Sequence, residues 1–166
     1  MGLLEIAFSV MLEELLRRAG LMQNTGTETI LFVDDNEDIA MVAKLLLQRF
    51  GYTVVTYLSG VEALKTFKLT PDKFDLVISD IGMPGMNGYE LIAEIRRIRQ
   101  NIPILLCSGS DEIDMVNNVK QCVAEGFLLK PFTMQELSRM TRSVLDNPFP
   151  RFSGTALNNK LLTEMA

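Results

Sequence analysis

The chain has 166 residues, enough for one domain of ordinary size with short extensions. Hydrophobic residues make up 48% of the chain and charged residues 22%, a composition typical of a packed core and not of a disordered chain. The formal net charge is -5, and the lysines and arginines are not clustered. The composition therefore argues against a nucleic-acid-binding surface.

The N-terminal stretch is apolar, but Glu5 interrupts it and no basic residue precedes it, unlike a secretory signal. Glu13 and Glu14 break the apolar run short of the roughly 20 residues that a membrane span needs. The cysteines Cys107 and Cys122 lie in apolar surroundings, which suits buried, reduced thiols. We therefore expect a cytoplasmic protein that does not contact a membrane.

After this stretch, short β-branched runs alternate with longer helical segments, which is typical of βα units around a parallel sheet. Most of the short runs are continuously apolar, as in strands that are buried on both faces. The predicted strands are Ile30–Val33, Thr53–Tyr57, Leu76–Ser79, Ile104–Cys107 and Phe127–Leu129. Together they predict one α/β domain with a parallel sheet.

Apolar stripes and capping signals predict the helices between the strands. One stripe consists of Ile39, Val42, Ala43 and Leu46, and a second of Leu91, Ile92, Ile95 and Ile98. Ser59 with Glu62, and Thr133 with Glu136, have the spacing of a capping box. A small polar linker precedes the domain, and a proline-containing segment follows its last helix. We expect three segments: 1–27 (N-terminal helix and linker), 28–146 (the α/β domain) and 147–166 (a tail).

Polar side chains follow four of the five predicted strands, where the loops of an open parallel sheet converge. They are Asp34 and Asp35, Asp80, Ser108 with Gly109, and Lys130 with Pro131. Three carboxylates at one edge repel one another, and a hard cation with oxygen ligands, such as Mg2+, would remove that cost. Lys130 can balance charge opposite the metal, and the hydroxyl of Ser108 can donate to an oxyanion. Asp80, so placed, can attack phosphorus.

Each of these residues also has an ordinary structural interpretation. An Asp-Asp pair after a strand is often a helix N-cap. Asp80 could begin a turn, and Lys130 before a proline could be a surface lysine. Their joint placement at the ends of strands one, three, four and five favours a functional site.

Four motifs resemble the receiver domains of two-component response regulators, and they occur in the order found in that family. They are ILFVDD ending at Asp35, DIGMPGMNG from Asp80 to Gly88, LCSG ending at Gly109, and Lys130-Pro131. The resemblance covers about Thr29 to Leu145. It implies a flavodoxin-like, doubly wound sheet of five parallel strands in the order 2-1-3-4-5. Receivers at the C-terminal end of hybrid sensor histidine kinases are the most similar in the amino-acid sequence of these motifs.

The resemblance also implies roles for the residues at the sheet edge. Asp80 would accept a phosphoryl group from a histidine kinase or a phosphotransfer protein. Asp35 and Asp80 would ligate Mg2+ directly, with the carbonyl of Gly82 as a backbone ligand, and Asp34 would act through water. Lys130 would contact the phosphoryl group.

Ser108 and Phe127 match the hydroxyl and aromatic switch positions of the family. Phe127 lacks a hydroxyl, which favours packing as its contribution to the switch. The chain contains no histidine and shows no ATP-binding segment, so the phosphoryl donor must be another molecule. The leading hypothesis is a binding module, not an enzyme, with self-catalysed phosphorylation and dephosphorylation and a protein-binding surface that a downstream protein recognises.

Two other functions compete with this hypothesis. An aspartyl-phosphate phosphatase of the haloacid-dehalogenase-like class would need a second Asp two residues after the nucleophile, where this chain has Gly82. A degenerate receiver would act as a structural or dimerising module. The intact set of Asp34, Asp35, Asp80 and Lys130 argues against this alternative.

The N-terminal stretch has the pattern of one apolar helix face, formed by Leu4, Phe8, Met11 and Leu15. A helix this short needs packing to be stable, so its stripe must be buried against another surface. The same helix of a second chain, its own α/β domain and a membrane surface are the alternatives. The polar face is not basic, which disfavours anionic lipid.

Removing residues 1–24 should convert a homodimer into a monomer, because the deletion removes the apolar stripe. Sedimentation or light scattering of the full-length and shortened proteins measures this directly. Full-length protein that is monomeric at high concentration, or shortened protein that stays dimeric, would contradict the dimer.

Overall fold

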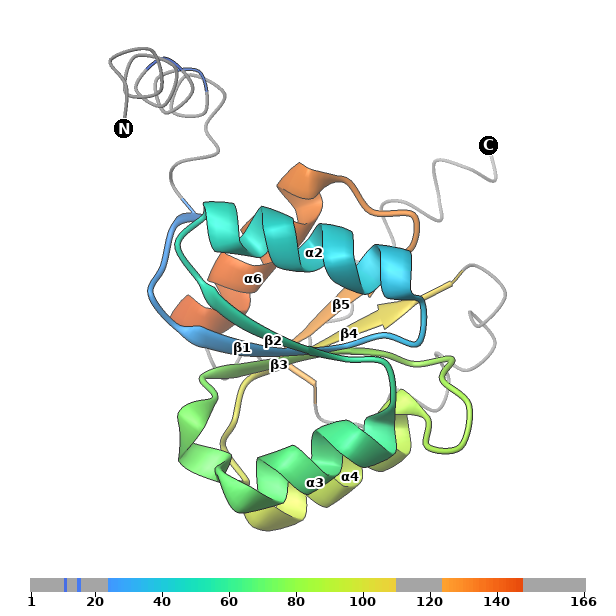
Figure 1. The fold of residues 1–166 in the computed structure, drawn as a ribbon. Coiled ribbons are helices and arrows are strands. Elements are labelled where there is room, and N and C mark those ends of the chain that lie inside the picture. Colours follow the sequence, from blue (N-terminus) through green and yellow to red (C-terminus); the bar gives the residue numbers. More distant parts are fainter. Residues whose placement is uncertain (1–10, 12–14, 16–23, 110–123, 148–166) are drawn as a thin grey trace, which may run out of the picture.

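The computed structural model of the protein describes residues 24–109 and 124–147, together with Met11 and Leu15 (Figure 1). Five parallel strands form one sheet in the order β2-β1-β3-β4-β5, as the resemblance implied. The strands are β1 (Thr29–Val33), β2 (Thr53–Tyr57), β3 (Leu76–Asp80), β4 (Ile104–Ser108) and β5 (Gly126–Leu129). The helices are α2 (Glu37–Arg49), α3 (Gly60–Leu69), α4 (Gly88–Ile98), α6 (Met134–Asp146) and the short 3-10 helix η2 (Pro71–Lys73).

Helices cover both faces of the sheet, with α2 and α6 on one side and α3 and α4 on the other (Figure 1). Alternate strand residues point to opposite faces, so each strand contributes to two cores. Leu31 and Val33 lie in the core with α3 and α4, whereas Ile30 and Phe32 lie in the core with α2 and α6. This double burial explains why the strands are continuously apolar in sequence.

The predicted strands are confirmed, with changes of one residue at their ends. β2 has the predicted bounds, whereas β1 and β5 each begin one residue earlier than expected. The strands β3 and β4 each continue one residue further, so Asp80 and Ser108 are their last residues. Both polar residues are therefore held by the sheet itself.

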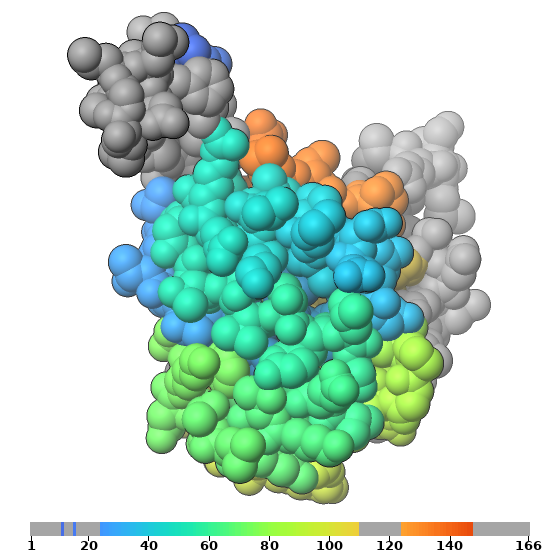
Figure 2. Space-filling view, in the orientation of Figure 1, coloured from blue at the N-terminus to red at the C-terminus, as the bar shows by residue number. Residues whose placement is uncertain are grey.

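The stripe predicted on the first helix is confirmed in part: Ala43 is buried and Ile39 packs against the core, but the buried face also includes Ala40 and Leu47, which were not predicted. Val42, which was also predicted to be buried, is 51% exposed; α2 lies on the face of the molecule seen in Figure 2. The small side chain of Ala40 lets the helix approach the sheet closely, and an argument from large apolar residues overlooks it. On α4 the prediction holds for three residues, while Ile98 at the helix end is 39% exposed.

Helix capping follows the sequence at one of the two predicted boxes. Thr133 and Glu136 form the reciprocal bonds of a capping box at the start of α6. Ser59 occupies the N-cap position of α3, but its side chain makes no capping hydrogen bond, so this predicted box is wrong. A further box, formed by Asn87 and Glu90 at the start of α4, was not predicted.

The segment that precedes β1 is packed against the domain. The hydroxyl of Tyr52 donates a 2.9 Å hydrogen bond to the carbonyl of Asn24. Arg142 on α6 forms ion pairs with Glu28 at 2.9 Å and with Asp146 at 2.8 Å. The predicted linker therefore lies beside the C-terminal half of α6.

Several expectations fall largely outside the described residues: the N-terminal helix, Cys122 and the tail after Asn147. Of the N-terminal stripe, Met11 and Leu15 are described; both are helical, and they are 55% and 58% exposed. Within the described part of the chain, no helix combines the length and apolarity needed to cross a membrane.

Two hydroxyls on the buried side of α6 predict a stabilising substitution. Ser138 and Thr141 are fully buried, and their hydroxyl oxygens have no hydrogen-bond partner within the described part of the chain. Replacing them by Ala and Val should leave the free energy of unfolding unchanged or raise it by about 1 kcal/mol, because an unpaired buried hydroxyl is lost. Thr133→Val, which removes the cap of the same helix, should instead lower it by about 1 kcal/mol. Urea unfolding measures both, and a large loss in the α6 core variant would contradict the prediction.

Candidate functional site

The site is formed at the carboxyl edge of the sheet by residues that end strands or directly follow them. β1 lies next to β3 with Val33 opposite Ser79, so the residues that follow, Asp34 and Asp80, lie side by side. Lys130 directly follows β5, and its backbone N–H donates a 2.7 Å hydrogen bond to the carbonyl of Ser108. This bond extends the β4–β5 ladder and places Lys130 at the same edge.

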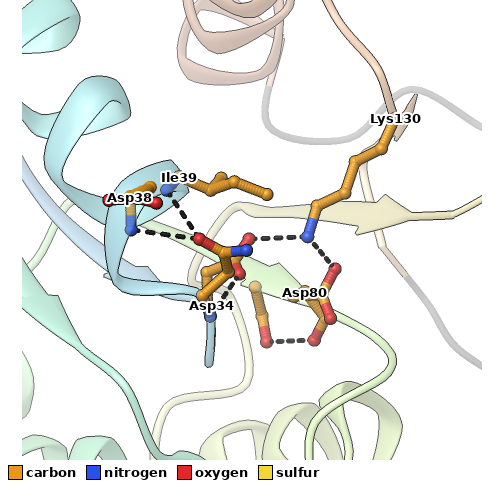
Figure 3. Close-up of polar contacts among 7 residues, drawn as sticks. Asp34, Asp38, Ile39, Asp80 and Lys130 are labelled. Carbon is orange, nitrogen blue, oxygen red and sulfur yellow. Dashed lines mark hydrogen bonds and ion pairs between the residues drawn. The ribbon is translucent and has the colours of Figure 1, made fainter.

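Lys130 bridges the two carboxylates (Figure 3). Its Nζ lies 2.6 Å from Oδ2 of Asp34 and 2.5 Å from Oδ1 of Asp80. The side chains of Asp34 and Asp80 are only 1% and 7% exposed, and that of Lys130 is 18% exposed. Oδ1 of Asp34 also accepts a 3.0 Å hydrogen bond from the backbone N–H of Asn36. Two buried carboxylates are thus held together by one ammonium group.

Burial and hydrogen bonding act in opposite directions on this cluster. Burial raises the pKa of Asp34, although hydrogen bonds from Lys130 and Asn36 partly oppose the rise. Burial by itself would lower the pKa of Lys130, but the carboxylates of Asp34 and Asp80 outweigh it and the pKa is raised. Lys130 therefore carries its charge at neutral pH.

Lys130 thus relieves part of the electrostatic repulsion that the sequence predicts among the three carboxylates. The three acids differ in how far they are buried. Asp35 is exposed, and its side chain makes no hydrogen bond or ion pair with a described residue. Gly82, two residues after Asp80, is also exposed. The structure leaves Asp35 accessible beside the buried pair.

The oxygen donors at this edge suit a hard divalent cation. Among the described residues, no group of three or more acidic, thiol or imidazole side chains could hold a metal. A cation here would need backbone or water oxygens in addition to carboxylates, which is common for Mg2+. Asp35, a carboxylate oxygen of Asp80 and the carbonyl of Gly82 are donors of the right chemistry, so the residues fit such an ion.

The two expected switch residues lie on β4 and β5. Ser108 is fully buried, and its hydroxyl donates a 3.0 Å hydrogen bond to the carbonyl of Gly109. Phe127 is half-buried and packs against the core on the side of α3 and α4. Ser108 also carries the backbone carbonyl that positions Lys130.

The loop from Asp80 to Gly88 folds back so that Gly88 lies against the backbone of Asp80, the phosphoacceptor candidate. The contacts that hold it there were not predicted from the sequence. The backbone N–H of Gly88 donates to the carbonyl of Ile81 at 3.0 Å. A Cβ atom on Gly88 would lie 2.3 Å from the carbonyl oxygen of Asp80, which is too short for two non-bonded atoms. The hydroxyl of Ser79 also donates to that oxygen at 2.9 Å. The glycine within DIGMPGMNG was the only signal for this close approach.

The comparisons with known proteins agree with this geometry. The family model of the response regulator receiver domain matches residues 30–142. Receiver domains belong to two-component systems and are typically phosphorylated, and they are not enzymes in the usual sense. They generally bind Mg2+ and interact with histidine kinases or phosphotransfer proteins. The chain belongs to this family.

Individual relatives show the same relationship. The chain is 34% identical to the sensor kinase CckA of Brucella abortus over 122 residues, which is 74% of this chain and 13% of the kinase. It is also 34% identical to the regulatory protein PhoP of Bacillus subtilis, over 70% of this chain and 48% of that protein. The chain spans about half or less of these curated relatives.

Solved structures are matched over almost their whole length. A receiver domain from Clostridium thermocellum is 29% identical with a TM-score of 0.68, covering 72% of this chain and 95% of that one. The chemotaxis protein CheY4 of Vibrio cholerae is 31% identical with a TM-score of 0.66, covering 72% of this chain and 99% of that one. The flavodoxin-like fold expected from the sequence is confirmed.

Replacing Lys130 by Met should destabilise the metal-free protein, because two buried carboxylates lose their cation. We expect a loss of about 3 kcal/mol in the free energy of unfolding at about pH 8. The raised pKa of Asp34 should rise further once Lys130 is gone, and a carboxyl with a raised pKa destabilises the fold above that pKa. The deficit should therefore shrink as the pH falls towards about 5.

Urea unfolding in EDTA across this pH range measures the deficit. Lys65→Met, at an exposed position on α3, is the control and should change little at any pH. A Lys130→Met deficit that grows towards acid pH would contradict the prediction.

Proposed function

We propose that Asp80 is the phosphoacceptor of a receiver domain that is phosphorylated by a histidine kinase or a phosphotransfer protein. The observation that carries the proposal is the state of its carboxylate. Lys130 holds one oxygen at 2.5 Å, whereas the other has no hydrogen bond or ion pair with a described residue. Asp80 thus has a fixed orientation and an oxygen that is available to react.

In the proposed transfer, an oxygen of Asp80 forms a bond to phosphorus as the bond between phosphorus and the donor's histidine nitrogen breaks. Lys130 contacts the phosphoryl oxygens and offsets their negative charge. Asp35, Asp80 and the carbonyl of Gly82 would hold Mg2+, and Asp34 would act on the ion through water. When bound, the ion supplies further positive charge to the phosphoryl oxygens.

The proposed output is a change in a protein-binding surface. A phosphoryl group on Asp80 draws the hydroxyl of Ser108 towards it, and Phe127 fills the space behind. Ser108 is the last residue of β4, and its carbonyl accepts the N–H of Lys130, which supports a movement shared between β4 and β5. A downstream protein would recognise the altered surface.

Three further proposals concern the chain as a whole. The N-terminal stripe that includes Met11 and Leu15 would join two chains into a homodimer. We further propose that the domain occupies residues 28–146, between an N-terminal segment and a tail, and that the protein acts in the cytoplasm. A degenerate receiver and an aspartyl-phosphate phosphatase are the competing functions. The contacts of Asp80 and Lys130 disfavour the first, and Gly82, in place of a second Asp, disfavours the second.

Asp80→Asn should abolish phosphorylation by a small phosphodonor with Mg2+, because an amide is a poor nucleophile. Intact-mass measurement should show one added phosphoryl group in the native protein and none in the variant. Asp72→Asn, which changes an exposed acid on η2, is the matched control and should be phosphorylated normally. Equal incorporation in Asp80→Asn would sink the assignment.

Asp35→Ala should weaken Mg2+ binding at least tenfold, since a hard cation loses one of its charged ligands. The chain contains no tryptophan, so isothermal calorimetry or the Mg2+-dependent rise in melting temperature is a suitable measurement. Glu37→Ala removes an exposed acid two residues away and should retain Mg2+ affinity within about twofold. Normal binding by Asp35→Ala would contradict the metal site.

A further inference from the structure

A buried ion pair joins α4 to the residue that precedes β5. Nη2 of Arg96 lies 2.6 Å from Oε1 and 2.8 Å from Oε2 of Glu125. The side chain of Glu125 is 5% exposed and that of Arg96 is 17% exposed. Arg96 also donates to the carbonyl of Gln100. A pair this well buried is costly to desolvate and contributes little net stability, so stability alone does not account for its presence.

The same glutamate fixes the start of the β4–β5 ladder. Oε2 of Glu125 accepts a 2.7 Å hydrogen bond from the backbone N–H of Ile104, the first residue of β4. The backbone N–H of Glu125 donates at 2.9 Å to the carbonyl of Ile104. Glu125 therefore binds both backbone groups of one residue, which leaves a single register available to the strand that follows.

The register of β5 decides where Lys130 lies. β5 has only four residues and is an edge strand of the sheet, so its ladder with β4 alone specifies its position weakly. A slip of two residues would keep each side chain on its face but move Lys130 by roughly 6.6 Å. The contacts of 2.5 and 2.6 Å to Asp80 and Asp34 would then be lost.

The other end of α4 is fixed to the phosphoacceptor loop. α4 begins at Gly88, which packs directly on the backbone of Asp80, and Arg96 lies in its last turn. A helix is a stiff element, so the backbone of Asp80 and the start of β5 are both positioned by one rigid segment. Asp80 and Lys130, which must lie together at the site, are thus both positioned through α4.

We propose that Arg96 and Glu125 are a positioning pair for Lys130: by fixing β5 in register against α4 and β4, they hold the lysine at Asp80. The inference rests on the proposed function, in which Lys130 contacts the phosphoryl group. Neither residue touches the reacting atoms, and neither belongs to the proposed metal ligands. Their loss should therefore slow phosphorylation without weakening the binding of Mg2+, because an ammonium group that moves away from Asp80 and Asp34 no longer competes with the ion.

The test compares phosphorylation of the full chain by acetyl phosphate at saturating Mg2+, well below the melting temperature of each variant. Glu125→Ala and Arg96→Met should lower the maximum rate about tenfold or more, as a displaced catalytic group does. Mg2+ affinity should stay the same or rise, because the proposed ligands Asp35, Asp80 and Gly82 are retained and the competing ammonium group has moved away. Glu125→Gln keeps an acceptor for Ile104 and should recover part of the rate, as should Arg96→Lys.

Arg142→Met is the matched control, because Arg142 is also 17% exposed and forms ion pairs with Glu28 and Asp146 away from the site. It should lose stability as Arg96→Met does and keep the native rate. A native rate in Glu125→Ala, with a reduced rate in Lys130→Ala, would overturn the positioning pair alone. If Lys130→Ala and Asp80→Asn also kept the native rate, the proposed function would fail.

The position of Lys130 is measured separately by the ¹⁵N resonance of its Nζ in the unphosphorylated protein. In Glu125→Ala this resonance should move towards that of an exposed lysine, and in Arg142→Met it should not move. This readout does not depend on phosphorylation. An unchanged Nζ resonance in Glu125→Ala would overturn the proposal even if phosphorylation had slowed.

Discussion

The structure of the site depends on one ammonium group between two buried carboxylates. The side chains of Asp34 and Asp80 are 1% and 7% exposed, and two carboxylates buried side by side are costly unless a cation lies between them. Lys130 supplies that cation from a strand that is 96 residues away from Asp34 in sequence. The cluster is therefore a product of the tertiary fold, and any change in the sheet that moves Lys130 also removes the cation that lies between the two acids.

The fold was largely predictable from the sequence because its signals are local and agree with one another. Five apolar runs and the alternation with helices gave the strands to within one residue, and the motifs from Asp34 to Lys130 gave the strand order. Details that depend on packing were not predictable. The buried face of α2 was predicted only in part because Ala40 contributes little hydrophobic signal, and Ser59 lacks its capping bond although its spacing to Glu62 is correct.

The site shows the same division between motif and geometry. Sequence reasoning selected Asp34, Asp35, Asp80 and Lys130, but it did not distinguish the buried Asp34 from the exposed Asp35, since adjacent residues point in opposite directions. It also missed the pair of Arg96 and Glu125. That pair joins α4 to the residue before β5. The two residues are 29 positions apart, so the contact produces no short sequence motif.

The charge balance explains why a receiver built in this way can act as a switch. An aspartyl phosphate carries about -1.5 to -2 charges, judged by other phosphorylated side chains, and Asp34 and Asp35 add to it. In the proposed switch, Lys130 alone would not offset this sum, so a divalent cation would share it, and the ammonium group would divide its three donors between Asp34 and the phosphoryl group. Lys130 is tied by its own backbone N–H to Ser108. A movement of the Lys130 backbone that accompanies its head group towards phosphate would therefore be shared with the end of β4, and α6 contacts both β4 and β5.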